Sequence, residues 1–248
     1  MQTDQATSTP PEAAPPTGAG AADDYATGAA DHPLATRSGR VKAWLDLIFV
    51  DHGFIRLAYL NLHHVGSGLW RAAQPAPADF RRFAAKGGRS VVNLRGGRDL
   101  GAWPLEQEAC AAAGLALYEL PFRTRQAPSK ETVRAAADLF ARIEYPALIH
   151  CKSGADRTGF AAALYLILRE GRTVAEAKRQ LLLRYGHMRA SRAGILDAFF
   201  DRYREDGEAR GMELLDWVET RYDPDALKQS FRPQTWASVV YDWILRRE

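Results

Sequence analysis

Between residues 69 and 150, short apolar runs alternate with longer segments whose apolar residues recur at helical spacing. The short runs have the length of buried strands, and the longer segments begin near proline or serine or end near glycine, as helices do. This alternation predicts a largely parallel sheet with helices on both faces. The predicted strands are 69–73, 90–94, 115–120 and 147–150, and the predicted helices between them are 78–86, 104–114 and 129–143.

After Gly171 the pattern is helical throughout, and we find no internal repeat. The apolar stripes of these segments indicate helices that pack on the same core. The expected fold class is therefore α/β, a central mostly parallel sheet flanked by helices, with a helical C-terminal extension. The predicted helices of the extension are 174–184, 193–203, 212–222 and 236–246.

The N-terminal region differs in composition from the rest of the chain. Its first 36 residues are rich in Ala, Pro, Thr and Gly and carry five acidic residues but no Lys or Arg. This composition predicts a disordered tail, and the missing basic start and apolar core argue against a signal peptide. The predicted division is a tail at 1–37, a helix and connector at 38–65, a core at 66–190 and the helical extension at 191–248.

A helix is expected after Ser38, whose hydroxyl suits an N-cap. Its apolar positions follow helical spacing, so this face either packs on the core or lies on a membrane surface. Core packing is favoured because the polar face is not strongly basic. The apolar positions are Val41, Trp44, Leu45, Ile48 and Phe49.

Composition narrows the class of protein. The 248 residues are 46% hydrophobic, enough for one well-buried domain with appendages. Two cysteines cannot form a disulfide framework, which predicts a reducing compartment and a cytoplasmic location, including the cytoplasmic face of a membrane. Because the acidic tail carries −5, the net charge of +3 leaves +8 on the remaining residues, which suits anionic substrates. We find no nucleic-acid-binding module, so no nucleic-acid partner is expected.

The segment from His150 to Gly159 carries the chemistry. Cys151 and Arg157 lie six positions apart with small residues between them, ahead of a helix-forming run at 160–168. In such a loop, successive N–H groups of residues 152–157 and the positive helix end face one concavity, which binds a tetrahedral dianion. The planar Arg157 side chain adds two parallel hydrogen bonds to phosphate oxygens. The same positive field favours a Cys151 thiolate, which is a nucleophile aimed at phosphorus.

His before Cys, Gly three positions after it, then Arg, Thr and Gly resemble the signature loop of the cysteine-dependent tyrosine and dual-specificity phosphatase superfamily. The resemblance covers about residues 66–190. It implies a phosphocysteine intermediate, with Thr158 hydrogen-bonded to the sulfur to ease its departure and His150 ordering the loop. It also implies that the phosphate is bound around Lys152, Ser153, Gly154 and Ala155. This chemistry requires no metal or other cofactor.

The general acid departs from the usual family pattern. Most relatives carry an aspartate on a mobile loop about thirty residues before the cysteine, but the corresponding residues 121–129 contain no carboxylate. Asp156 is the favoured candidate, because bacterial tyrosine/lipid phosphatases and myotubularins also carry Asp immediately before the Arg. The alternative is that Asp156 only braces the loop or pairs with an arginine. Asp99 and Glu131 are the remaining candidates.

Three functions compete for this site. The first is a protein tyrosine or dual-specificity phosphatase. The second is a phospholipid phosphatase acting on a phosphoinositide, phosphatidylglycerophosphate or lipid A-type head group. Lys152 with Arg95 and Arg98 would favour such multiply anionic groups, and peripheral membrane association would follow. The third is a phosphate-binding module without turnover, which is disfavoured because both Cys151 and Arg157 are present.

Two further features are interpreted as structural. Cys110 lies in an Ala-rich helical stretch and is expected to be a small buried hydrophobic residue rather than a redox partner of Cys151. The pair His63-His64 lacks metal-ligand partners at suitable spacing, so no metal site is predicted.

Overall fold

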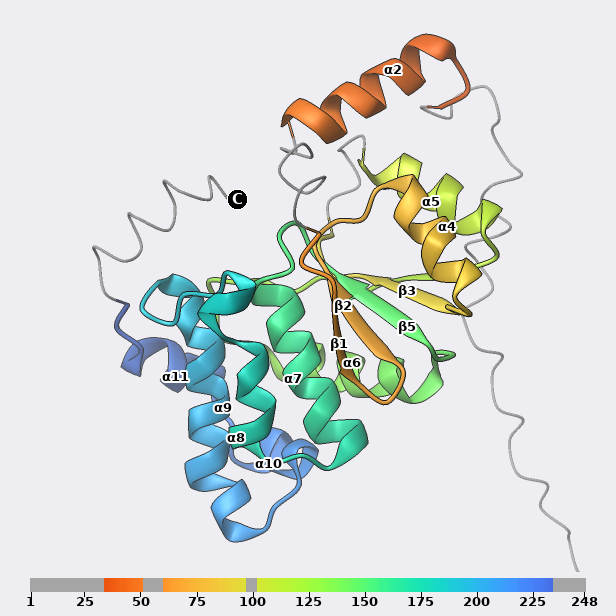
Figure 1. The fold of residues 1–248 in the computed structure, drawn as a ribbon. Coiled ribbons are helices and arrows are strands. Elements are labelled where there is room, and N and C mark those ends of the chain that lie inside the picture. The colour runs from red at the N-terminus through yellow and green to blue at the C-terminus, as the bar shows by residue number, and fades with distance from the viewer. Residues whose placement is uncertain (1–33, 51–59, 97–101, 234–248) are drawn as a thin grey trace, which may run out of the picture.

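The computed structural model describes residues 34–50, 60–96 and 102–233 (Figure 1). The expected fold class is confirmed. Within these residues, one sheet is parallel except at its first strand, and helices cover both of its faces. In spatial order the strands are β1 (His63–Gly66), β2 (Leu69–Ala72), β5 (Ala147–His150), β3 (Ser90–Asn93) and β4 (Ala116–Glu119).

Strand β1 was not predicted. Its four residues, His-His-Val-Gly, form no apolar run, yet they pair antiparallel with β2 at the edge of the sheet. An antiparallel edge strand is held by backbone hydrogen bonds and needs little apolar burial, so its sequence signal is weak.

The sheet separates two helix layers. Val91 of β3 packs with Phe80 and Cys110 on one face, whereas its neighbour Val92 belongs to the main core on the other face with Phe160. This alternation follows from the two-residue period of a strand. The helices of the first layer are α4 (Pro77–Ala85) and α5 (Ala102–Ala112), and those of the second are α6 (Lys130–Arg142) and α7 (Asp156–Glu170).

The C-terminal helices continue the second layer, on the side of the sheet opposite α4 and α5 (Figure 1). An aromatic cluster joins them to α7: the Phe160 ring lies 5.6 Å from Phe199, which in turn lies 5.6 Å from Trp217. These helices are α8 (Val174–Ala177), α9 (Ile195–Asp206), α10 (Leu214–Thr220) and α11 (Pro224–Ser230).

The helix expected at 174–184 is shorter than predicted. It ends at Ala177, and the chain continues as single 3₁₀ turns at Lys178–Gln180 and Leu183–Tyr185. The Gln180 carbonyl accepts a hydrogen bond from Arg71 of β2 at the point where the predicted helix would continue. Helix α11 was not predicted, and the helix expected at 236–246 lies outside the described residues.

The N-terminal helix α2 (Arg37–Leu45) is capped by Thr36, not by Ser38, because the Thr36 hydroxyl accepts a hydrogen bond from the Gly39 N–H. One π-helical turn, Asp46–Val50, follows it. The expected packing of the apolar stripe is also wrong in detail. Ala43 and Leu47 pack with residues of α5, whereas four of the five predicted positions are exposed: Val41, Trp44, Leu45 and Phe49. Among the described residues, no helix combines the length and apolar character needed to cross a membrane.

Candidate active site

The loop that carries Cys151 follows β5 and leads into α7. Since β5 lies between β2 and β3 and is parallel to both, the loop lies beyond the carboxyl ends of the strands, where ligands bind in open α/β sheets. Cys151 is 2% exposed and Arg157 8% exposed, so both lie below the surface of the loop.

The backbone of this loop is held by Arg71, a fully buried arginine of β2. Its Nη2 donates to the Gly154 carbonyl at 2.6 Å and to the Ala155 carbonyl at 3.3 Å. In a trans peptide the N–H points opposite to the C=O. These contacts therefore turn the N–H groups of Ala155 and Asp156 away from Arg71. The guanidinium also lies 4.0 Å from the Tyr185 ring centroid.

Asn61 holds the preceding peptide in the same way. Its Nδ2 donates to the carbonyls of Ser153 and Tyr185, at 3.1 and 3.0 Å. With the Ser153 carbonyl held there, the Gly154 N–H points inward and lies 3.2 Å from the Cys151 sulfur. The backbone of Asn61 is left-handed (φ 52°), a conformation that asparagine adopts more readily than most residues.

Gly154 is required at its position for two reasons. Its φ is +70°, and a Cβ would lie 2.7 Å from the Ala73 nitrogen and 2.8 Å from the Ala72 carbonyl carbon. Both neighbours are backbone atoms at the end of β2 and directly after it, which cannot move aside as a flexible side chain can.

Gly154→Ala is therefore expected to destabilise the protein by about 1–3 kcal/mol and to reduce kcat/KM. Gly171→Ala is the matched control, because Gly171 has a similar φ of +61° but no atom within 4 Å of the added Cβ. Denaturant unfolding and kinetics of both variants check the prediction. An equal loss in both would mean that backbone strain alone, and not the close approach to Ala73, explains the requirement for glycine.

The Cys151 environment favours the thiolate. Burial of the thiol opposes ionisation, but the charge of Arg157 and hydrogen bonds from Thr158 and Ser153 outweigh it, and the pKa of Cys151 lies below its usual value. Among the described residues, the buried Thr158 hydroxyl has no oxygen or nitrogen partner, which leaves it to the sulfur.

His150 is held by a buried network on the side of α5. Its Nε2 lies 2.8 Å from Glu106 Oε1, and the other carboxylate oxygen accepts hydrogen bonds from Gln74 and Asn93 at 2.9 and 3.0 Å. The imidazole is fully buried. This geometry suits the loop-ordering role that the family resemblance implies for His150.

Asp156 lies at the first position of α7 and faces the C-terminal helices. Its Oδ1 is 2.7 Å from His187 Nδ1, and His187 Nε2 is 2.6 Å from Asp197 Oδ2. Neither His187 nor Asp197 was found from the sequence. Asp156 therefore has a buried histidine as a partner.

Of the other candidate residues, Lys152, Ser153 and Arg157 lie in the loop and Glu131 lies away from it. Arg157 Nη1 donates to the Arg95 carbonyl at 3.1 Å, which links the loop to the end of β3. Lys152 and Ser153 are half-buried in the loop. Glu131 is exposed in the first turn of α6, and Asp99 and Arg98 lie outside the described residues.

Residues 65–172 match a family model described as "Polymorphic toxin system, DSP-PTPase phosphatase". This segment is a DSP-PTPase-like phosphatase domain. The resemblance inferred from the loop is thereby confirmed, and no curated protein matches the chain. Among solved structures, the chain is similar to P. aeruginosa TpbA, at 21% identity over 70% of this chain and 91% of that chain, with a TM-score of 0.44. It is also similar to the core catalytic domain of the S. cerevisiae PP-IP phosphatase SIW14, at 17% identity over 68% and 89%, with a TM-score of 0.44.

The matched phosphatase domain does not contain all residues that hold its loop. Asn61 precedes residue 65, and Gln180, Tyr185 and His187 follow residue 172. Arg71 lies inside the domain and left a signal in the sequence, because a charged residue within an apolar strand is rarely tolerated unless its charge is paired. His187 left no such signal.

Proposed function

We propose that the phosphatase domain hydrolyses phosphate monoesters through a phosphocysteine formed on Cys151. The observation that carries this proposal is the buried thiol itself, whose pKa is lowered although burial opposes ionisation, with the Gly154 N–H 3.2 Å from its sulfur. A structural cysteine in an apolar site has the opposite property, as Cys110 does: burial, followed by the charge of Glu106, raises its pKa.

The residues divide the reaction between them. Arg157 and the N–H groups of residues 152–157 bind the three equatorial oxygens of the phosphoryl group. The Cys151 thiolate attacks phosphorus in line as the bond to the leaving oxygen breaks, and that oxygen takes a proton from Asp156. Water then attacks the phosphocysteine, and the Thr158 hydroxyl stabilises the departing thiolate.

Phosphotyrosine is the proposed substrate. Because Cys151 and Arg157 are almost fully buried, a phosphoryl group has to enter below the surface to reach them. The long tyrosyl side chain extends further from a peptide backbone than serine or threonine does, so it reaches such a site more easily.

A phospholipid head group is the second candidate, favoured by the apolar side chains exposed on α2 and its π-turn. Trp44 is 42% exposed and Phe49 65% exposed. This helix packs on α5 and is joined to it by the Arg40–Glu108 ion pair, two positions along the chain from the Glu106 that holds His150. A membrane bound to this surface would therefore lie close to the phosphate loop.

The proposal is tested with a phosphotyrosine peptide, a phosphoserine peptide and neutral-lipid vesicles that contain a phosphoinositide or phosphatidylglycerophosphate. We expect hydrolysis that a chelator does not inhibit, the highest kcat/KM on phosphotyrosine, and phosphate bound to Cys151 after acid quenching. A higher kcat/KM on vesicles that falls with Trp44→Glu selects the lipid function. Inhibition by the chelator, or quenched enzyme without bound phosphate, overturns the proposed chemistry.

A further inference from the structure

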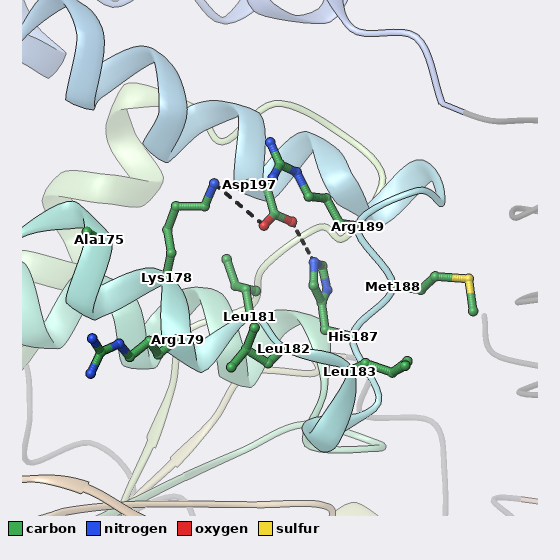
Figure 2. A pocket seen from close by; sticks show the side chains of 10 residues that line it. All are labelled: Ala175, Lys178, Arg179, Leu181, Leu182, Leu183, His187, Met188, Arg189 and Asp197. Atoms are coloured by element: carbon green, nitrogen blue, oxygen red, sulfur yellow. Dashed lines mark hydrogen bonds and ion pairs between the residues drawn. The ribbon is translucent and has the colours of Figure 1, made fainter.

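A chain of three buried titratable side chains leads from the phosphate loop into the C-terminal helices. Asp156 of α7 contacts His187 at 2.7 Å. His187 in turn contacts Asp197 of α9 at 2.6 Å (Figure 2). The side chains of Asp156, His187 and Asp197 are 9%, 0% and 4% exposed. Since His187 lies outside the matched residues 65–172, the phosphatase family model does not include this chain of contacts.

The contacts define the protonation state of His187. Each ring nitrogen faces a carboxylate oxygen, and both nitrogens can donate only when the ring is an imidazolium. Burial opposes this charge, but the hydrogen bonds and negative charges of Asp156 and Asp197 outweigh it and raise the pKa of His187 to about 9. We call Asp156, His187 and Asp197 the buried unit. At neutral pH it holds one proton more than it would with a neutral histidine between two carboxylates.

Positively charged side chains lie near Asp197, at the end of this unit that is farther from the phosphate loop. Lys178 Nζ lies 3.9 Å from Asp197 Oδ1 and 2.6 Å from Asp201, and Arg189 contacts Asp201 at 2.9 Å. His187 and Asp197 line a cavity of about 420 Å³ together with Lys178 and Arg189 (Figure 2). Asp156 lies on the opposite side of the imidazole, toward the phosphate loop.

The pairing poses a problem for the proposed general acid. If Asp156 faces the imidazolium as a carboxylate, it accepts a hydrogen bond there and has no proton of its own to give. We propose that His187 is a positioning residue that holds the proton which Asp156 delivers to the leaving oxygen. This inference rests on the proposed function and deepens it.

The proton balance closes over both steps. In the first step the S–P bond forms, the P–O bond breaks and the leaving oxygen keeps the electron pair. The Nδ1 proton of His187 moves to the Asp156 carboxylate, which passes it on to that oxygen and is a carboxylate again, leaving a neutral imidazole that still donates Nε2–H to Asp197. In the second step the attacking water keeps one proton in the released phosphate. Its other proton returns through Asp156 to His187 as the P–S bond breaks and the thiolate re-forms.

Two aryl phosphates separate this role from a purely structural one. Phenoxide needs a proton as it leaves, whereas 2,4-dinitrophenoxide does not. His187→Gln is expected to slow phenyl phosphate hydrolysis by about 10²-fold and 2,4-dinitrophenyl phosphate hydrolysis much less. Asp156→Asn is expected to give the same selectivity, and the double variant no further loss, because the two residues act as one unit.

The pH profile gives a second readout. His187 is active when protonated, so the wild-type rate on phenyl phosphate is expected to fall as the pH rises above about 9. Asp197→Asn removes a negative charge that favours the imidazolium, so the fall should begin at least about one pH unit lower. Asp201→Asn is the matched control on the same helix, because Asp201 contacts Lys178 and Arg189, and it should leave the fall in place.

The outcomes are distinguishable. If Cys151→Ser retains turnover, the proposed function and this inference both fail. If Cys151→Ser is inactive but His187→Gln slows both aryl phosphates equally, only the role of His187 is overturned. Should the variants not fold, the wild-type protein decides: nitrogen NMR of His187 at pH 7 must show both ring nitrogens protonated, and a neutral ring overturns the inference.

Discussion

Cys151→Ser is expected to reduce turnover of a phosphotyrosine peptide by at least about 10⁴-fold while the peptide still binds. The Arg157 charge and the hydrogen bonds from Thr158 and Ser153 lower the pKa of the Cys151 thiol, but a serine hydroxyl is far too weak an acid for the same groups to ionise it. The amide groups that would hold the phosphate are unchanged. Single-turnover kinetics and equilibrium binding of the labelled peptide measure the two effects separately.

Cys110→Ser is the matched control for this variant. Cys110 is also buried, at 1% exposure in α5, but burial, followed by the charge of Glu106, raises its pKa, so it is not a nucleophile. Its replacement should leave kcat/KM within a few-fold of wild type. Comparable losses in the two variants would contradict the assignment of the nucleophile to Cys151.

Arg157→Lys is expected to lower kcat/KM by about 10²–10³-fold. Lysine keeps the positive charge but loses the planar fork that makes two parallel hydrogen bonds to phosphate oxygens. It also loses the hydrogen bond from Arg157 Nη1 to the Arg95 carbonyl. Steady-state kinetics on a phosphotyrosine peptide measure the effect, with Arg142→Lys on the exposed end of α6 as the control. A loss below about tenfold would mean that Arg157 contributes charge alone.

The sheet and its helices could be predicted because their signals are local. Strands β3 and β5 lie where the apolar runs placed them, since a strand covered on both faces reads as a continuous apolar segment. Strand β1 and the 3₁₀ turns after α8 could not be predicted, because they are fixed by pairing with β2 and by the Arg71 contact to Gln180. These are tertiary contacts without a sequence pattern.

The phosphate loop was predictable for the same reason: its residues are consecutive. The residues that hold it are not. Arg71 lies 83 positions before Gly154, and His187 lies 31 positions after Asp156, so no spacing rule connects them. The sequence therefore identified the candidate acid Asp156 but not the imidazolium beside it, which changes how that acid has to work.

The support that Asn61, Gln180 and Tyr185 give to the loop has a consequence for how this domain can be transferred between proteins. These residues lie on both sides of the segment 65–172, so that segment alone does not contain every contact that holds the phosphate loop. A fragment that contains only residues 65–172 would keep Cys151 and Arg157. It would lose the flanking residues whose contacts orient the anion-binding peptides of the loop. Any natural or engineered fusion that preserves activity has to carry the flanking chain along with it.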